Sequence, residues 1–84
     1  MSRIKYWHPT GENKNIHVTR VGDHLFEAYS NGLWQVNKLS LSDGTLDVVD
    51  SGVPTKSEER NFEYAKRQCE DSLERLLSKG NQNV

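Results

Sequence analysis

Few residues in this sequence are of types that carry chemistry, and their spacing does not assemble a site. The histidines are His8, His17 and His24, and the single cysteine is Cys69. No histidine stands at a metal-ligand spacing from the cysteine. Cys69 falls on the apolar stripe of a predicted helix, where a small hydrophobe is expected, and the sequence supplies no neighbouring base to activate its thiol. We therefore predict no metal site, no bound cofactor and no cysteine nucleophile.

Ligand-binding loops are also missing from the sequence. Asp43–Gly44 is the only stretch with a likeness to a calcium loop, but the further oxygen ligands and the closing glutamate of an EF-hand are lacking. No glycine-rich phosphate loop and no nucleophile elbow occurs. The sequence therefore predicts a protein that has no catalytic residues and is not an enzyme.

Aromatic and basic residues suggest one alternative chemistry, the binding of single-stranded nucleic acid. Proteins of this kind stack bases on aromatic rings and contact phosphates with lysine or arginine. Tyr29 and Trp34 are the candidate stacking platform, although Glu27 and Asp47 on the same predicted face would repel phosphate. The candidate contacts of this alternative are Arg3, Lys5, Trp7, Arg20 and Lys38.

The charge balance makes nucleic acid the weaker of the candidate partners. The formal net charge is −1 over 84 residues, and non-specific affinity for nucleic acid rises with the number of phosphates that a protein neutralises. Residues 1–20 carry four basic side chains against one acidic side chain, whereas residues 21–50 carry one against five. A basic arm therefore precedes an acidic sheet region.

Short turns organise the first half of the chain. Asn31–Gly32 and Asp43–Gly44 favour the positive φ angles of two-residue type I′ turns, and Gly22–Asp23 is a third, weaker turn signal. Residues 14–21 alternate in polarity and are rich in β-branched side chains, which predicts a first strand. Together these signals predict a four-stranded antiparallel β-meander.

One C-terminal helix follows the predicted sheet. Thr55 and Glu58 match a capping box, which starts the helix at Lys56, and Gly80 is placed to end it after about Lys79. Apolar residues recur at spacings of three and four, at Phe62, Ala65, Cys69, Leu73, Leu76 and Leu77. The predicted fold class is therefore α+β, with the helix packed on one face of the meander.

Counting outward from two-residue turns assigns the side chains to two sheet faces, and predicts Tyr29 opposite Trp34 and Leu41 opposite Leu46. The face that seats the helix is predicted to carry Val21, Phe26, Ala28, Leu33, Leu39, Leu41, Leu46 and Val48. The other face is predicted to carry an interaction surface of Ile16, Val18, Tyr29, Trp34 and Val36, with Leu25 and Val49 beside it.

This second face is too apolar to serve only as a solvated surface. One interpretation is that Ile4, Tyr6 and Trp7 fold back over it, and another is that a second protein covers it, as large exposed apolar patches commonly indicate. We predict a non-enzymatic protein-interaction module. It is expected to form a homodimer or to bind another protein, through this face or through a sheet edge.

The length of the chain allows one domain with one core. We assign residues 1–13 to an extended basic and aromatic arm, residues 14–80 to the α+β domain and residues 81–84 to a frayed tail. No apolar run is long enough for a signal peptide or a membrane span. A lone cysteine cannot form an internal disulfide. These features predict a cytoplasmic protein with no membrane partner.

The junction between sheet and helix, Gly52 to Glu59, resembles that of the arm-type DNA-binding domains of phage integrases. In that family a three-stranded sheet reads the major groove of DNA. This sequence departs from the pattern because Glu27, Asp47 and Asp50 stand where basic residues are wanted. In its small size, its single domain and its lack of catalytic motifs, the chain is also similar to many accessory proteins of phages and mobile elements.

Overall fold

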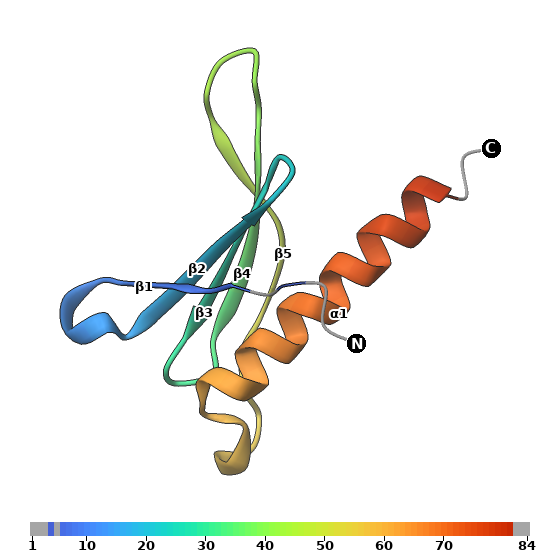
Figure 1. Ribbon diagram of the computed structural model, residues 1–84. Coiled ribbons are helices and arrows are strands. Elements are labelled where there is room, and N and C mark those ends of the chain that lie inside the picture. The colour runs from blue at the N-terminus through green and yellow to red at the C-terminus, as the bar shows by residue number, and fades with distance from the viewer. Residues whose placement is uncertain (1–3, 5, 82–84) are drawn as a thin grey trace.

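The computed structural model describes residues 4 and 6–81 (Figure 1). It contains one antiparallel sheet with the strand order β1-β2-β3-β4-β5, and a helix, α1, that contacts β3 and β4. The elements are β1 (His8–Thr10), η1 (Glu12–Lys14), β2 (Ile16–Val21), β3 (His24–Tyr29), β4 (Trp34–Leu39), β5 (Leu46–Gly52), η2 (Ser57–Glu59) and α1 (Phe62–Asn81). The predicted α+β meander with a C-terminal helix is confirmed, with five strands instead of four.

The additional strand comes from the predicted N-terminal arm. Residues His8–Thr10 pair with β2, so that Pro9 lies opposite His17. Ile4 is buried in the core, and Trp7 packs against that core. The arm therefore covers part of the helix side of the sheet, and not the opposite face as one interpretation of the sequence suggested.

The turn between β2 and β3 has two residues, as predicted. Val21 lies opposite His24, so only Gly22 and Asp23 form the connection, with Gly22 at φ 63°. The predicted pairing of Ile16 with Tyr29 is confirmed. The first hairpin thus keeps the register that the sequence predicts.

The turn between β3 and β4 is one residue longer than predicted. The amide of Tyr29 donates to the carbonyl of Leu33 at 2.9 Å, which leaves three residues, 30–32, in the loop. Gly32 adopts a φ of 92°, as expected for a three-residue hairpin loop with glycine at the positive-φ position. As a result Ala28, and not Tyr29, lies opposite Trp34, and every side chain of β4 changes face.

The turn between β4 and β5 is also longer than two residues. The Ser40 amide donates to the Thr45 carbonyl at 2.8 Å, so residues 41–44 form a four-residue loop. Leu39 therefore lies opposite Leu46, and the predicted pair of Leu41 with Leu46 is wrong. This hairpin rises above the other strands (Figure 1).

A β-bulge separates the two halves of β5. Val36 lies opposite Asp50 and Asn37 lies opposite Val48, which leaves Val49 without an opposite residue on β4. Such a bulge changes which face the residues on either side of it occupy. Asp50 therefore shares the helix side with Val36, whereas Val48 lies on the other side with Asn37.

The core lies between α1 and the middle strands of the sheet. Its buried residues are Ile4, Phe26, Ala28, Trp34, Val36, Ala65, Cys69 and Leu73. The predicted helix stripe is confirmed at Ala65, Cys69 and Leu73, whereas Leu77 remains 41% exposed. The C-terminal half of α1 extends past the sheet (Figure 1), which explains why Leu77, at the end of the apolar stripe, stays exposed to solvent.

The start of the helix differs from the prediction. Glu59 Oε1 accepts hydrogen bonds from the Thr55 amide at 3.0 Å and the Lys56 amide at 3.2 Å, but these close only the short 3-10 turn η2. The Thr55 amide bond comes first among the causes that hold the pKa of Glu59 below its ordinary value. Asn61 caps α1 itself, because its Oδ1 accepts from the Tyr64 amide at 2.8 Å.

Removal of this cap is expected to destabilise the domain. Asn61→Ala deletes the bond to the Tyr64 amide and should lower the free energy of unfolding by about 1 kcal/mol, the usual cost of losing an N-cap side chain. Thr55→Ala is the matched control, since it affects only the turn that precedes the helix. Urea denaturation of both variants measures the difference, and an equal or larger loss in Thr55→Ala would contradict the assignment of Asn61 as the cap.

The helix ends at Asn81, so Gly80 lies within its last turn and does not terminate it. Residues 82–84 of the predicted tail lie outside the described residues. In the described part of the chain, no helix combines the length and the apolar character needed to cross a membrane.

Candidate functional site

The face of the sheet opposite α1 is the main candidate site, and we call it the open face. The observed register places seven apolar side chains on it: Ile16, Val18, Leu25, Tyr29, Leu39, Leu46 and Val48. The first five are half-buried by their neighbours, and Leu46 and Val48 are more than half exposed. The described elements place no second layer over this face (Figure 1), although apolar sheet faces are normally covered.

A hydrogen-bonded polar cluster lies at the centre of the open face. Glu27 Oε1 accepts from Gln35 Nε2 and from Asn37 Nδ2, each at 3.3 Å, and Gln35 Nε2 also approaches Asn37 Oδ1 at 3.1 Å. Asn37 is only 5% exposed, so these bonds satisfy polar groups that water reaches poorly. The cluster therefore fixes three side chains across β3 and β4 in one arrangement.

Tyr29 stands beside this cluster at the end of β3. Partial burial, and then the charge of Glu27, raise the pKa of its phenol. The hydroxyl therefore stays protonated at neutral pH and can donate a hydrogen bond. The open face thus presents an aromatic residue and neutral donors together with its aliphatic side chains.

Two residues of the predicted interaction surface do not lie on this face. Trp34 is 7% exposed and Val36 is completely buried, and both belong to the core beneath α1. Trp34 lies opposite Gly52, where an added Cβ atom would overlap the indole ring. The assignment of these two residues to the uncovered face is wrong, because the three-residue loop before Trp34 shifts the strand by one position. Ile16, Val18 and Tyr29 do lie on the open face.

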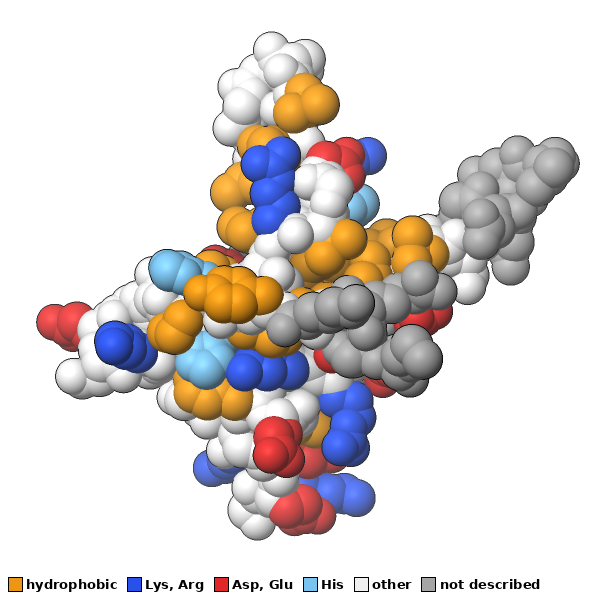
Figure 2. All heavy atoms as spheres, in the orientation of Figure 1, with side chains coloured by type: hydrophobic (Ala, Val, Ile, Leu, Met, Phe, Trp, Pro, Cys, Tyr) orange, Lys and Arg blue, Asp and Glu red, His pale blue; other side chains and the backbone are white. Residues whose placement is uncertain are grey.

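Leu39, Leu46 and Val48 were assigned to the helix side by the sequence and lie on the open face instead. The three-residue loop before Trp34 accounts for all three changes, because it inverts β4, and Leu46 and Val48 share the face of the β4 residues that they pair with. The alternation of Leu46, Asp47 and Val48 shows that Leu46 and Val48 share a face but not which face it is, so no local signal in the sequence reveals their position. Figure 2 shows hydrophobic side chains along the projecting hairpin and between it and α1.

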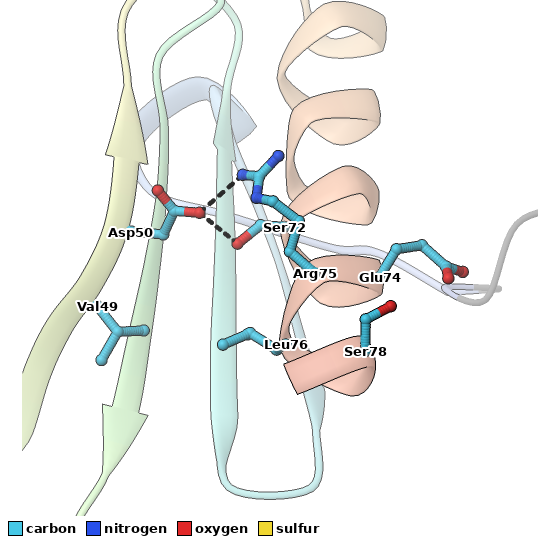
Figure 3. Close-up of a pocket in the computed structure, with 7 residues that line it drawn as sticks. All are labelled: Val49, Asp50, Ser72, Glu74, Arg75, Leu76 and Ser78. Carbon is cyan, nitrogen blue, oxygen red and sulfur yellow. Dashed lines mark hydrogen bonds and ion pairs between the residues drawn. The ribbon is translucent and has the colours of Figure 1, made fainter. Parts of the chain in front are cut away.

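A groove between α1 and β5 is the second candidate feature. It has a volume of about 480 Å³, and Val49 and Leu76 extend into it from opposite walls (Figure 3). Asp50 Oδ2 accepts from Ser72 Oγ at 2.6 Å and from Arg75 Nη2 at 2.9 Å across its upper part. Partial burial raises the pKa of Asp50, but these bonds and one from the Ser51 amide outweigh it and keep the pKa below its ordinary value. The groove is therefore crossed by a charged link that ties the helix to the sheet edge.

The candidate nucleic-acid contacts are not gathered on one surface. Trp7 is half-buried on the helix side. Arg20 lies in the row of Leu25 and Asn37 on the open face, whereas Lys38 follows Asn37 and points to the other side. The remaining two candidates, Arg3 and Lys5, lie outside the described residues.

Cys69 and His24, two side chains of types that can carry chemistry, lie in structural surroundings. Burial, and then three nearby carboxylates, raise the pKa of Cys69 to about 12, so its thiol is protonated at neutral pH. His24 Nδ1 lies 3.0 Å from Asp23 Oδ1 at the first turn. Across residues 4 and 6–81, no three histidine, cysteine or acidic side chains are grouped so that they could hold a metal ion.

Comparison with protein-family models, with curated proteins and with solved structures finds no significant match to this chain.

Proposed function

We propose that this chain is a non-enzymatic protein-interaction module that forms a homodimer through its open face. The observation that supports the proposal is a sheet with seven apolar side chains on a face that carries no second layer. Of the seven large hydrophobic residues that are exposed in the described part of the chain, five fall between Leu41 and Val53, in and around β5. Exposed apolar surface concentrated in this way is typical of protein-binding sites.

The charges on the open face favour a second copy as the partner. Arg20 and Glu27 lie on the same face in neighbouring rows of the sheet. In a two-fold interface the same patch meets itself, so Arg20 of each protomer can approach Glu27 of the other. A surface with one charge of each sign is therefore self-complementary, whereas a face of uniform charge would repel its copy.

Direct pairing of two β5 edges is a less favourable arrangement. An antiparallel match of residues 46–48 with a copy sets Asp47 opposite Asp47, which places like charges in register. The bulge at Val49 puts residues 50–52 out of step with residues 46–48, so the pairing of the two β5 edges cannot continue through residues 50–52 with matching faces. The dimer therefore packs through side chains of the open face and does not extend the sheet.

We expect the dimer interface to be of ordinary size. A specific interface buries about 800 Å² on each partner, which is roughly an eighth of the 5950 Å² surface of this chain. Seven apolar side chains around a satisfied polar centre match the usual composition of an apolar core with a limited number of hydrogen bonds. The interface needs no rearrangement of the fold.

A pair of neighbouring valines tests the proposal. Val48 is 57% exposed on the open face, and Val49 is 45% exposed beside the groove. Val48→Glu should weaken the dimer at least about 100-fold, because each of the two substituted side chains costs about 1.4 kcal/mol or more in the interface. Val49→Glu should leave the dimerisation constant within a few-fold. Sedimentation velocity over a concentration series measures both.

Three outcomes would contradict the proposal. A native chain that stays monomeric up to millimolar concentration has no homodimer. Loss of the dimer in Val49→Glu with retention in Val48→Glu places the contact in the groove. Salt-sensitive quenching of tryptophan fluorescence by short single-stranded oligonucleotides, from a chain that does not dimerise, would instead support the nucleic-acid alternative.

A further inference from the structure

Four side chains form an aromatic cluster where the N-terminal segment meets α1, and we call it the clasp: Trp7, His17, Phe62 and Lys66. The rings of His17 and Phe62 are stacked with centroids 3.9 Å apart and planes 12° from parallel. Lys66 Nζ lies 5.4 Å from the centroid of Phe62 and 5.6 Å from that of Trp7. Both distances are within the range of a cation–π contact. The clasp therefore joins the N-terminal segment, β2 and α1 through one ammonium group and three rings.

His17 is held in this cluster as a neutral ring. Its Nδ1 atom is buried and has no hydrogen-bond partner among residues 4 and 6–81. The residues opposite His17 in β1 and β3 are Pro9 and Ala28, which carry no charge, and the charged side chain facing it from α1 is Lys66. Burial, and then the charge of Lys66, lower the pKa of His17 from its ordinary value of 6.5.

A proton on His17 would change the balance of this cluster. A charged imidazole interacts favourably with the face of Phe62, but burial, and then the charge of Lys66, oppose the proton and lower the pKa of His17. A protonated Nδ1 would also be a buried charged donor without an acceptor, which is an unfavourable state. Release of β1 removes Pro9, the residue paired with His17, from beside the ring, so that water reaches the imidazole and the burial penalty falls.

We propose that the clasp is an acid-sensitive latch, in which a proton on His17 releases Ile4 and residues 6–10 from α1 while strands β2–β5 stay folded. The N-terminal segment is suited to local release because β1 pairs along only three residues, His8–Thr10. Its other attachments are the buried Ile4 and the half-buried Trp7. Segments with few buried contacts open at a lower free energy than the core of a domain.

The direction of the pH effect follows from proton linkage. In the released state His17 is more accessible to water, so its pKa lies closer to the ordinary value of 6.5 than in the closed state, where burial and then Lys66 lower it. Between these two values the released state binds more protons, so acid favours release. The closed state is fully favoured above pH 6.5, loses stability as the pH falls below it, and shows no further loss below the lowered pKa. This inference does not depend on dimerisation.

The indole NH resonances of Trp7 and Trp34 provide a direct test by NMR between pH 7.5 and 5. In the native chain the Trp7 signal should shift toward its position in an unstructured peptide as the pH falls, while the Trp34 signal, from the core, should remain in place. His17→Phe keeps a ring on Phe62 and removes the titrating group, so the Trp7 shift should disappear. His8→Phe is the matched control, because His8 is exposed on β1, and should keep the shift.

Each of three other results would contradict the proposed latch. A Trp7 shift that persists in His17→Phe assigns the effect to another group. A Trp7 signal that does not move above pH 5 in the native chain shows that the clasp stays closed. Movement of the Trp34 signal with the same midpoint shows global unfolding and not local release.

Discussion

Trp34→Ala is expected to lower the free energy of unfolding by about 3–5 kcal/mol, the usual cost of truncating a buried aromatic residue to alanine. The indole is 7% exposed, belongs to the core cluster and lies over Gly52 in β5. A domain of this length has a total stability of roughly 4–13 kcal/mol. The substitution therefore removes a large part of the stability, and urea denaturation at a fixed protein concentration measures it.

Tyr29→Ala is the matched control for this prediction. Tyr29 precedes the same hairpin loop but lies half-buried on the open face, so its truncation should cost about 1 kcal/mol, near the centre of the distribution for single substitutions. The register predicted from the sequence, with a two-residue turn, places both aromatic residues on one uncovered face. It would give both variants a similar and small loss in the free energy of unfolding. Equal losses for the two variants would contradict the observed register.

Gly32→Ala is expected to lower the free energy of unfolding by about 2–5 kcal/mol. The residue has a φ of 92°, and an added Cβ atom would overlap the carbonyl oxygen of Glu59 in η2. The positive φ costs about 1–2 kcal/mol for an L-residue, and forcing an atom into a packed site adds about 1–3 kcal/mol. The hairpin loop and η2 would have to separate to admit the methyl group.

Gly22→Ala separates the two contributions to that loss. Gly22 also has a positive φ, 63°, but an added Cβ atom meets nothing within 4 Å. Only the backbone cost of about 1–2 kcal/mol therefore remains. Thermal or urea denaturation of the two variants compares them, and a Gly22→Ala loss as large as that of Gly32→Ala would show that the contact with η2 contributes nothing.

Much of the fold follows from local patterns in the sequence. The alternation in residues 14–21 and the two-residue turn at Gly22–Asp23 correctly predict the pairing of β2 with β3. The three- and four-residue spacing of apolar side chains correctly predicts which face of α1 is buried at Ala65, Cys69 and Leu73. These features depend on contacts within a few residues or on periodicity, which a single sequence displays directly.

The start of α1 shows where local patterns become ambiguous. Thr55 and Glu58 match a capping box, but Asn61 is an equally good N-cap residue six positions later. In the structure, Glu59 closes the 3-10 turn η2, and Asn61 caps the start of the helix. The position of Phe62 against His17 distinguishes the two starts, and that contact joins residues 45 positions apart.

The candidate site was predicted only in part for the same reason. Ile16, Val18 and Tyr29 were placed on the uncovered face because their register depends on the simple first turn. Trp34 and Val36 were placed there in error, and Leu39, Leu46 and Val48 were placed on the helix side in error, because their faces all depend on the length of the loop before Trp34. One additional residue in that loop inverts β4 and, with it, the residues of β5 that pair with its second half.

The sequence by itself therefore determined the order of the elements, the positions of the turns and the amphipathic stripe of α1. Whether Asn31–Gly32 closes a loop of two or three residues was decided by tertiary structure, because glycine supplies a positive φ to both. Only the longer loop turns Trp34 toward α1 and lets its ring lie over Gly52. Burial of that one large ring selects the register, and the register in turn decides which apolar side chains remain on the open face.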